Sequence, residues 1–326
     1  MKNNNILLIY PKSEVDYDLK ISSKKPSFSK RVLSLINYLS KVKIFESING
    51  HLVPPLGLVN IASVTPANWQ IDIIDERINP IGNQQFLELS RKYKIIRLTS
   101  FTANVNRAYL IADEFRRYGS TVVIGGYHAS LLQEEAWLHC DTVINGFAEL
   151  SWLDFLKDFE ENNLKKVYKR KKNQYINPDW KFINKEHYLS TNFIEVSRGC
   201  HNKCDFFFFF SFNNGLSYRN IDEVISSIEE YNGHLVILVS DNLTSNKAYC
   251  KELFSKIIAK NINVNIVANI GHDFAYDEEL VQMAARAGLK SALIGFETLD
   301  VSNKEELYKN KKIRADYRRC IDTLHK

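Results

Sequence analysis

Two cysteines, separated by three residues and followed by five phenylalanines, form the part of this sequence best suited to chemistry. They lie in SRGCHNKCDFFFFF, residues 197–210, which places thiols at Cys200 and Cys204. Thiolates on a short loop after a strand are the ligands that hold iron–sulfur clusters or zinc in proteins. The run NFIEVSRGC predicts a strand that ends at Cys200. We therefore interpret Cys200 and Cys204 as metal ligands.

The remaining cysteines show no such grouping. The chain has five cysteines, and the other three are Cys140, Cys250 and Cys320. An odd and scattered set differs from the regularly spaced set of a disulfide framework. Because disulfides are rare in reducing compartments, we expect a cytoplasmic protein whose isolated cysteines are small buried residues.

Length and composition indicate an ordinary globular protein. The chain has 326 residues, enough for about two domains, with 45% hydrophobic and 25% charged residues. The net charge of +5 is small for this length, so neither a nucleic-acid partner nor a membrane surface is expected. No apolar run approaches the roughly 18 residues of a membrane-spanning helix. The start NILLIYP predicts a first strand rather than a signal peptide.

Strand-like and helix-like segments alternate in the first half of the chain. Strand patterns cover residues 5–11, 70–79, 94–102, 120–130 and 141–149. Apolar residues recur at helical spacing in residues 29–42, 54–65 and 106–119. The alternation predicts an α/β fold with a doubly wound, Rossmann-like parallel sheet in residues 1–150. Ligands of such sheets bind beyond the carboxyl ends of the strands, so residues 99–102, 125–130 and 145–149 form the candidate binding rim.

Residues 151–190 are expected to join the two halves as a linker. Within them, KKVYKRKKNQYIN at residues 165–177 carries six basic residues. A basic patch for nucleic acid is one interpretation of this stretch. We prefer a solvated hairpin, because runs of charge are usually solvated.

The alternation starts again after residue 190. Strand patterns cover residues 192–200, 234–242, 263–271 and 290–300, and helix patterns cover residues 220–232, 247–261, 277–288 and 315–326. This order predicts a partial (β/α) barrel of about four units in residues 191–326, with functional loops at the carboxyl ends of its strands. Its last strand would leave an open edge with unpaired backbone groups. A protein partner, a second copy or a further C-terminal segment would cover that edge.

The order and spacing of short segments resemble those of radical S-adenosylmethionine (SAM) enzymes that carry an N-terminal cobalamin-binding domain. The resembling segments are NILLIYP, PPLGLVNIAS, IDIIDERI, VVIGGYHAS, VINGFAE, VSRGC, VSDNLTSN and IGFETLD. Together they span nearly the whole chain, and their order is more specific than any one of them. The resemblance implies a cobalamin-binding type of Rossmann domain, followed by a partial radical-SAM barrel.

In that family, a loop Cys-x-x-x-Cys-x-aromatic-Cys gives three thiolates to a 4Fe-4S cluster, whose open iron binds SAM. The resemblance implies that Cys200 and Cys204 are the first two ligands and that Phe206 lies against the adenine of SAM. Phe207 stands where the third cysteine is expected. Phenylalanine has no lone pair to give to iron, so the three-thiolate site of the family cannot form from this loop.

Two other residues are candidates to replace the missing thiolate. His201 lies inside the loop, but at a variable position of the motif. Cys250 lies in a predicted helix, where packing is the other interpretation. Two thiolates with outside help would hold a labile cluster or an adventitious metal. We favour a degenerate loop, in which phenylalanines pack where relatives hold the cluster.

The resemblance also implies residues that bind SAM and cobalamin. Asp241 and Glu297 match the acidic positions that face SAM, although either carboxylate could equally be a helix cap or a loop hydrogen-bond acceptor. The cobalamin motif Asp-x-His-x-x-Gly is absent, and this branch of the family holds cobalamin through the rim of the sheet. The matching rim residues are Thr99, Ser100, Gly125, Gly126, Tyr127 and His128. VINGFAE departs from the acidic, glycine-rich end usual in the family, although Glu149 remains.

These features lead to two hypotheses about function. The resemblance implies a radical-based methyltransferase or a related carbon-skeleton enzyme, in which a SAM-derived radical abstracts hydrogen and methylcobalamin donates methyl. The missing third thiolate and the partial barrel argue against full radical chemistry in this chain. The alternative is a non-catalytic pseudoenzyme that binds a cofactor or serves as a scaffold for a partner. No residue pattern indicates whether the substrate is a small molecule or a peptide.

Overall fold

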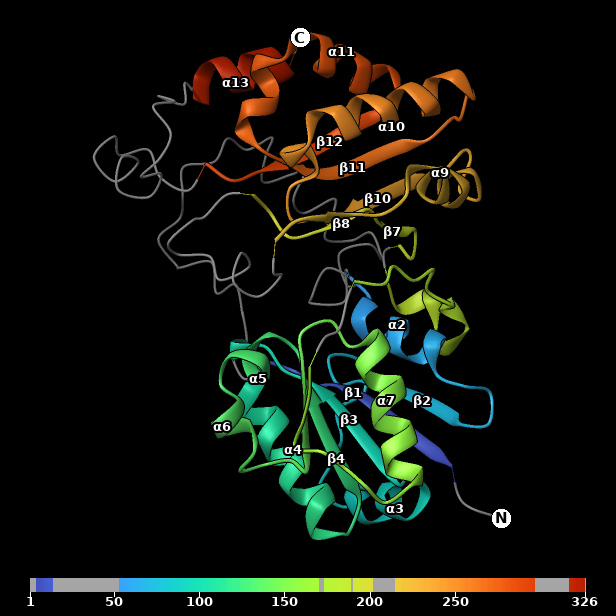
Figure 1. Ribbon diagram of the computed structural model, residues 1–326, viewed down its shortest axis with the longest axis vertical. Coiled ribbons are helices and arrows are strands. Elements are labelled where there is room, and N and C mark those ends of the chain that lie inside the picture. Colours follow the sequence, from blue (N-terminus) through green and yellow to red (C-terminus); the bar gives the residue numbers. More distant parts are fainter. Residues whose placement is uncertain are drawn as a thin grey trace, which may run out of the picture. The chain divides into compact units, whose positions relative to one another are not determined.

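The chain folds into two α/β units, Met1–Thr191 and Asn192–Lys326 (Figure 1). The computed structural model describes residues 4–13, 53–169, 173–188, 190–201, 215–296 and 317–325. The helix expected at residues 29–42 lies outside the described residues. Each unit has its own parallel sheet, which confirms the predicted fold class.

The first unit is built on a six-stranded parallel sheet. Its strands are β1 (Asn5–Tyr10), β2 (Gln70–Asp75), β3 (Ile95–Thr99), β4 (Thr121–Gly125), β5 (Thr142–Asn145) and β6 (Val167–Lys169). Their spatial order is β2-β1-β3-β4-β5-β6. The order reverses at β1, so the topological switch point lies between β1 and β3. Ligands of doubly wound sheets bind at that point.

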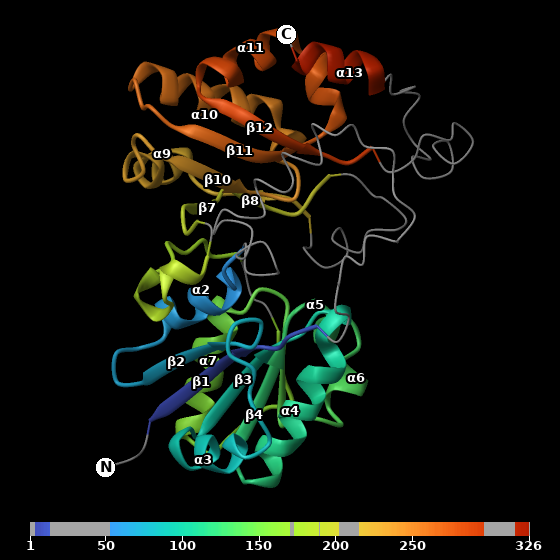
Figure 2. The same cartoon turned by 180° about the vertical axis from the view of Figure 1, so that it is seen from behind.

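Helices cover both faces of this sheet (Figures 1 and 2). One face packs against α2 (Leu56–Val64) and α7 (Glu149–Glu160). The other face packs against α3 (Gln85–Lys92), α4 (Val105–Arg117), α5 (Tyr127–Leu131) and α6 (Gln133–Ala136). The alternation of β1 shows why: Ile6 and Leu8 enter the first cluster, whereas Leu7 and Ile9 enter the second.

The segment expected to be a linker is part of the first unit. α7 begins at Glu149 and buries Trp152 and Phe155 against the sheet. β6 then pairs with β5 in parallel, with Ile144 opposite Tyr168. The part of the basic stretch around Val167 is therefore a sheet strand rather than a hairpin. Its apolar residues Val167 and Tyr168 are too few to give a strand pattern, and the pairing with β5 supplies the missing stabilisation.

Among its described residues, the second unit has four parallel strands in sequential order. They are β7 (Phe193–Glu195), β10 (Leu235–Val239), β11 (Asn265–Ile270) and β12 (Leu289–Ile294), arranged β12-β11-β10-β7. One face of the sheet is covered by α9 (Ile221–Glu229), α10 (Lys247–Ala259) and α11 (Glu278–Arg286) (Figure 1). Sequential parallel strands with helices on one face are the arrangement of part of a (β/α) barrel. Asn220 caps α9, as its position before the helix predicts, because its side chain accepts from the N–H groups of Asp222 and Glu223.

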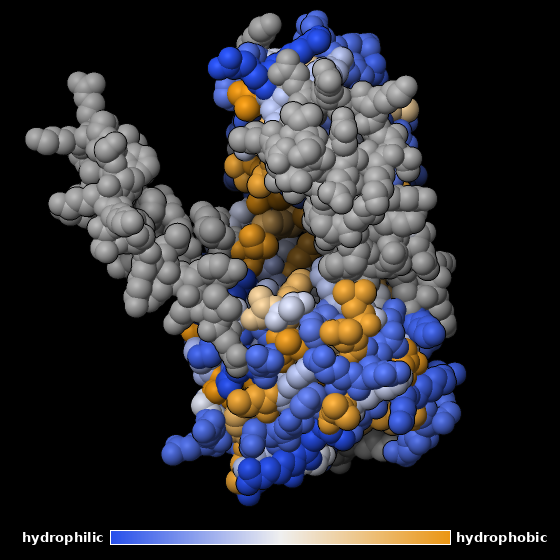
Figure 3. Space-filling view, turned by 90° about the vertical axis from the view of Figure 1, so that its left-hand side faces the viewer, coloured by the Kyte–Doolittle hydropathy of each residue, from blue (hydrophilic) through white to orange (hydrophobic). Residues whose placement is uncertain are grey.

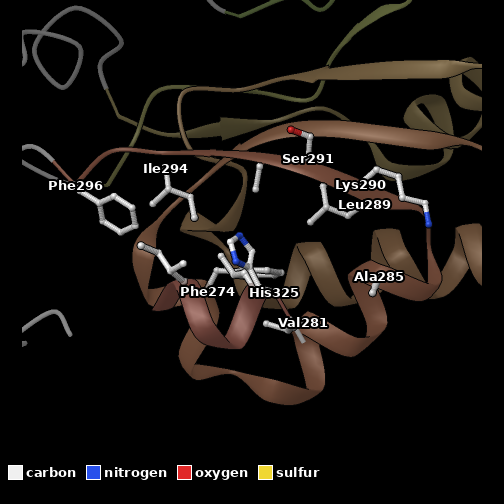
Figure 4. Close-up of a pocket in the computed structure, with 12 residues that line it drawn as sticks. Phe274, Val281, Ala285, Leu289, Lys290, Ser291, Ile294, Phe296 and His325 are labelled. Atoms are coloured by element: carbon white, nitrogen blue, oxygen red, sulfur yellow. The ribbon is translucent and has the colours of Figure 1, made fainter. Parts of the chain in front are cut away.

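β12 is the edge strand of this sheet among the described residues. Beside it, a pocket of about 430 Å³ opens between β12, α11 and the last helix, α13 (Tyr317–Leu324). Ile294, Phe274 and His325 project into the space between strand and helices (Figure 4). Lys290, Ser291 and His325 line it together with apolar residues, and none of the residues that the sequence indicates for SAM or metal binding is among them.

The surface shown in Figure 3 mixes hydrophilic and hydrophobic residues. Within the described parts of the chain, no helix is both long enough and apolar enough to cross a membrane.

Candidate cofactor-binding sites

The loops after β3 and β4 form one continuous rim in the first unit. The N–H of Ser100 donates to the carbonyl O of Gly125 at 2.8 Å, which extends the pairing of β3 and β4 past their ends. The N–H of His128 then donates back to the carbonyl O of Ser100 at 3.2 Å. The structure therefore brings together Thr99, Ser100, Gly125, Gly126, Tyr127 and His128.

Gly126 makes this close approach possible. Its backbone has φ +98° and ψ 177°, a conformation that is essentially restricted to glycine. A Cβ at this position would lie 2.6 Å from the carbonyl O and 2.7 Å from the N of Ser100. Both contacts are with backbone, so neither can be relieved by a side-chain rotation. A side chain at residue 126 would have to separate the two loops.

A row of aromatic rings follows the rim across three neighbouring strands. Phe101 lies 6.2 Å from the ring of Tyr10 at the end of β1, and 5.6 Å from the ring of Tyr127 after β4. Phe101 is 36% exposed, and the other two rings are partly exposed. The row includes both strands of the switch point, β1 and β3. The rings are tilted by 47° and 56° to one another, and the guanidinium of Arg77 lies 4.2 Å from the centroid of the Tyr10 ring. The row therefore offers apolar contact area along the rim rather than one flat surface.

His128 is held inside the domain by both of its ring nitrogens. Nδ1 lies 3.1 Å from Thr102 Oγ1, and Nε2 lies 3.2 Å from Glu135 Oε1. The side chain is only 8% exposed. Its contacts show an imidazole that fixes the loop after β4, and they leave neither nitrogen free for a metal in this arrangement.

A buried ion pair between Glu76, after β2, and Arg107 of α4 stabilises the chain near the same rim. Glu76, directly after β2, is fully buried and accepts from Arg107 of α4 through both carboxylate oxygens, with Nε at 2.9 Å from Oε2. Glu76 also accepts from the N–H of Ile81 at 3.0 Å. Glu76 lies within the strand pattern at residues 70–79, but nothing in the sequence identifies Arg107 as its partner. Thirty-one residues separate the two side chains, and no motif links them.

The cysteine loop of the second unit leaves and returns through a short antiparallel pair. β8 (Ser197–Arg198) pairs with β9 (Ser217–Tyr218), so that Arg198 lies opposite Ser217. Arg198 is 2% exposed and forms two hydrogen bonds of 2.6 Å with Glu195, the last residue of β7. The stems of the loop are thereby fixed to the end of the first strand of this sheet.

Asp241 holds the start of the cysteine loop at the end of β10. Its Oδ2 accepts from the N–H of Gly199 at 2.7 Å, and Gly199 has φ +90°. Cys200 follows, with its Sγ 3.6 Å from Ser245 Oγ. Burial raises the pKa of the Asp241 carboxyl, although the Gly199 N–H and the charge of Arg198 act in the opposite direction. The resemblance assigns Asp241 to SAM binding, and in the structure its carboxylate also accepts from the backbone of the cysteine loop.

We expect Asp241→Ala and Asp241→Asn to have different effects on the loop. Asn keeps an oxygen for the Gly199 N–H and removes the buried charge, whereas Ala removes both. Hydrogen exchange of the peptide containing Gly199 should therefore accelerate in Asp241→Ala and stay near the wild-type rate in Asp241→Asn. A similar acceleration in both variants would show that charge, rather than the hydrogen bond, holds the loop.

The same pair tests the raised pKa. The native state binds the Asp241 proton more tightly than the unfolded chain does, so ionisation above that pKa lowers stability. We expect Asp241→Asn to unfold at a higher urea concentration than the wild type at pH 7. The difference should shrink as the pH falls towards the ordinary carboxyl value near 3.8. Urea unfolding followed by circular dichroism at several pH values measures it.

The loops after β10 and β11 are also tied together. Asn242 Oδ1 accepts from the N–H and the hydroxyl of Thr244, and Thr244 Oγ1 accepts from the N–H of Gly271 at 2.9 Å. Asn269 Nδ2 donates to the carbonyl O of Ser240 at 3.0 Å. The carboxyl ends of β7, β10 and β11 therefore form a polar rim in the second unit.

The described residues do not supply a third ligand for a cluster. Cys250 is fully buried in α10, its thiol donates to the carbonyl O of Leu243 at 3.0 Å, and burial raises its pKa to about 12. That environment favours the neutral thiol, so Cys250 packs as a small buried residue. His201 is exposed. Four candidate residues lie outside the described residues: Cys204, Phe206, Phe207 and Glu297.

The described parts of the chain likewise contain no group of three His, Cys, Asp or Glu side chains that could hold a metal. In the sequence, Phe207 stands where the resemblance places the third thiolate, and a phenyl ring has no lone pair for iron. The rim of the first unit fits a flat cofactor better. It has the row of partly exposed aromatic rings, and Gly126 allows the backbone of the loop after β4 to lie close to that of Ser100.

Comparison with known proteins finds a domain match in the first unit and relatives that are similar over most of this chain. Residues 49–152 match the B12 binding domain. The chain is 28% identical over 293 residues to a bacteriochlorophyllide d C-12(1)-methyltransferase of Chlorobaculum tepidum, covering 85% of this chain and 63% of that protein. It is 30% identical over 291 residues to the bacteriochlorophyllide d C-8(2)-methyltransferase of the same organism, covering 82% and 62%.

A more distant relative is an anaerobic magnesium-protoporphyrin IX monomethyl ester cyclase of Synechocystis, at 22% identity over 310 residues. These matches agree with the resemblance of the chain to cobalamin-binding radical SAM enzymes. The chain spans less than two thirds of the length of the relatives named above.

Proposed function

We propose that this chain binds cobalamin at the rim of its first unit and does not carry out cluster-dependent radical chemistry by itself. The observation that carries the proposal is the match of residues 49–152 to the B12 binding domain, in the same unit as a rim suited to a flat macrocycle. The methyltransferase relatives favour an origin in methyl transfer. Phe207, at the position where the family has its third cysteine, favours a cofactor-binding role.

The residues of the first unit have distinct parts in this proposal. Gly126 keeps the loops after β3 and β4 together, so that backbone rather than side chains faces the macrocycle. Tyr10, Phe101 and Tyr127 supply apolar contact area and exclude water from one side of it. His128 fixes the loop after β4 through Thr102 and Glu135. When bound, cobalamin supplies a methyl group that can be transferred to a substrate.

The second unit retains a site that is suited to SAM but incomplete for its cleavage. The polar rim at the ends of β10 and β11 offers carboxylate and amide groups to the charged and hydroxyl groups of SAM. Phe206 and Glu297 complete the proposed set by their match to the family. We derive no radical step, because Cys200 and Cys204 provide two thiolates where the family uses three.

The test combines cofactor retention with a search for SAM cleavage. The purified chain, anaerobically reconstituted with iron and sulfide, is incubated with hydroxocobalamin, and unbound corrinoid is removed by gel filtration. SAM and a strong reductant are then added, and 5′-deoxyadenosine is measured. We expect about one cobalamin per chain and no 5′-deoxyadenosine above the protein-free control.

Either half of the proposal can fail separately. A folded chain that retains no cobalamin would contradict the binding role. Formation of 5′-deoxyadenosine by the wild-type chain, at a rate that rises with protein concentration, would show that the hypothesis of a radical-based enzyme is correct. The same assay is run on Phe207→Cys, which adds the third thiol to the loop. Phe207→Tyr is its matched control, since it changes the residue without adding a thiol.

A further inference from the structure

An ion pair at the end of β2 holds a guanidinium against the aromatic row of the first unit. Arg77 donates from Nε to Oδ1 of Asp75 at 2.9 Å and from Nη2 to Oδ2 at 2.5 Å, so the two side chains meet as a paired fork. The side chain of Asp75 is 3% exposed. The guanidinium also lies over the ring of Tyr10, in cation–π contact with one end of the row. A change in the position of Tyr10 therefore alters the surroundings of this ion pair.

The same carboxylate also holds a residue that lies far along the chain. The hydroxyl of Tyr188 donates to Oδ2 of Asp75 at 3.1 Å, across 113 residues of sequence. Tyr188 is 8% exposed, and burial, together with the charge of Asp75, raises the pKa of its hydroxyl. One oxygen of Asp75 thus accepts from both Arg77 and Tyr188. Side chains in one hydrogen-bond network are energetically coupled, so a change at Arg77 is expected to reach Tyr188.

Tyr188 ends a stretch of chain that leads towards the first strand of the second unit. This stretch, residues 179–188, contains two short 3-10 helices, η2 (Trp180–Phe182) and η3 (Lys185–His187). Trp180 is 7% exposed, and η2 packs near α2 and β2. Because 3-10 helices of one turn have little stability of their own, the attachment of the end of this stretch depends in large part on the hydrogen bond of Tyr188. We call residues 179–188 the connecting segment.

We propose that this network couples cobalamin binding at the aromatic row to the attachment of the connecting segment to the first unit. The inference rests on the proposed function, because it adds a regulated segment to the same site. A macrocycle that packs against Tyr10 fixes the ring over which Arg77 lies. Arg77 then holds Asp75 in the position that accepts from Tyr188. Coupling between two sites is reciprocal in free energy, so loss of the Tyr188 hydrogen bond weakens cobalamin binding, and cobalamin slows opening of the segment.

The experiment measures hydrogen exchange of the peptide that contains the connecting segment, with and without hydroxocobalamin. The affinity for hydroxocobalamin is measured by equilibrium titration of the same protein. In the wild type, we expect saturating hydroxocobalamin to slow this exchange by about 5- to 20-fold. Tyr188→Phe removes only the hydroxyl. It should reduce the slowing to less than about twofold and weaken hydroxocobalamin binding by about 3- to 10-fold, the effect of one hydrogen bond to a charged group.

The chain contains a matched control for this variant. Tyr168 of β6 is 4% exposed, and its hydroxyl donates to Oδ2 of Asp158 in α7 at 2.8 Å. Tyr168→Phe therefore removes the same type of hydrogen bond from a buried tyrosine of the same unit, and should change neither the slowing nor the affinity. Arg77→Lys keeps the charge but lacks the paired donors, so it should resemble Tyr188→Phe. It keeps the test decisive if Tyr188→Phe does not fold.

Several outcomes would overturn the coupling. Equal slowing in the wild type and in Tyr188→Phe would show that the hydroxyl transmits nothing. Equal losses in Tyr188→Phe and Tyr168→Phe would show a general effect of removing a buried hydroxyl. Hydroxocobalamin that binds the wild type without slowing exchange of the connecting segment would overturn the coupling and leave the proposed function intact. A wild-type chain that binds no hydroxocobalamin overturns the proposed function together with the coupling.

Discussion

Arg107→Ala is expected to lower the stability of the first unit by about 3 to 5 kcal/mol, because it leaves the carboxylate of Glu76 buried without its partner. Glu76 is fully buried, and the side chain of Arg107 is 12% exposed. Removing one member of a buried pair costs far more than the net worth of the pair, since the remaining charge keeps its desolvation penalty. The variant should also loosen the rim, because Glu76 accepts from the backbone of Lys12 and Ile81.

The chain itself provides a matched control on the same helix. Arg117 of α4 is 67% exposed on its side chain and forms a 3.5 Å pair with Glu114. Arg117→Ala removes the same residue type from the same helix, but should cost about 0.5 kcal/mol or less, as exposed pairs do. The double variant Glu76→Gln with Arg107→Met should be more stable than Arg107→Ala, because it leaves no buried charge.

Tryptophan fluorescence suits this measurement. The four tryptophans all lie in the first unit: Trp69, Trp137, Trp152 and Trp180. Urea unfolding followed by this signal therefore reports on the first unit alone. Equal losses for Arg107→Ala and Arg117→Ala would contradict the role of the buried pair.

Gly126→Ala is expected to have a comparable or larger effect, about 3 kcal/mol or more, together with loss of cobalamin binding. Two costs combine in this variant. The backbone of residue 126 is in a region that alanine disfavours by about 1 to 3 kcal/mol. In addition, the new Cβ would lie 2.6 Å from the carbonyl O of Ser100, so the loops after β3 and β4 would have to move apart.

Gly119→Ala separates the two costs. Gly119 also has a positive φ, +83°, but a Cβ there meets nothing within 4 Å. We expect Gly119→Ala to cost about 1 to 2 kcal/mol, from the left-handed backbone alone, and to leave cobalamin binding unchanged. Similar stability and binding losses in the two variants would show that the close approach at Ser100 does not matter for the rim.

Most strands and helices of this fold could be predicted from the sequence, because apolar runs and helical periodicity coincide with the buried faces. The run at residues 94–102 became β3, and the helix pattern at 106–119 became α4. β6 could not be predicted, because its two apolar residues are flanked by lysines and its stability comes from pairing with β5. The strand pattern at residues 120–130 became β4, which ends at Gly125, and the chain after Gly126 forms α5, which the sequence did not predict.

The site residues show a similar division. The rim position of Gly126 and His128 follows from the order of the strands, but the burial of His128 between Thr102 and Glu135 depends on tertiary packing. From the sequence, Cys250 could be a substitute ligand or a packing residue, and Asp241 could bind SAM or accept a loop hydrogen bond. Only the surroundings of each side chain in the fold bear on this choice. Arg97 of β3 is a buried charged residue that could have been singled out from the sequence. It lies in the middle of an otherwise apolar strand pattern, KIIRLTS, where a charged residue is unusual.

We propose that Phe207 prevents assembly of the cluster, while the rest of the chain keeps its fold and its cobalamin-binding rim. The most direct test is to count iron and acid-labile sulfide per chain after anaerobic reconstitution, in the wild type, in Phe207→Cys and in the Phe207→Tyr control. We predict values close to four of each in Phe207→Cys, the content of a 4Fe-4S cluster, and far lower values in the other two. Close to four of each in the wild type would contradict the account and require a ligand from outside the loop.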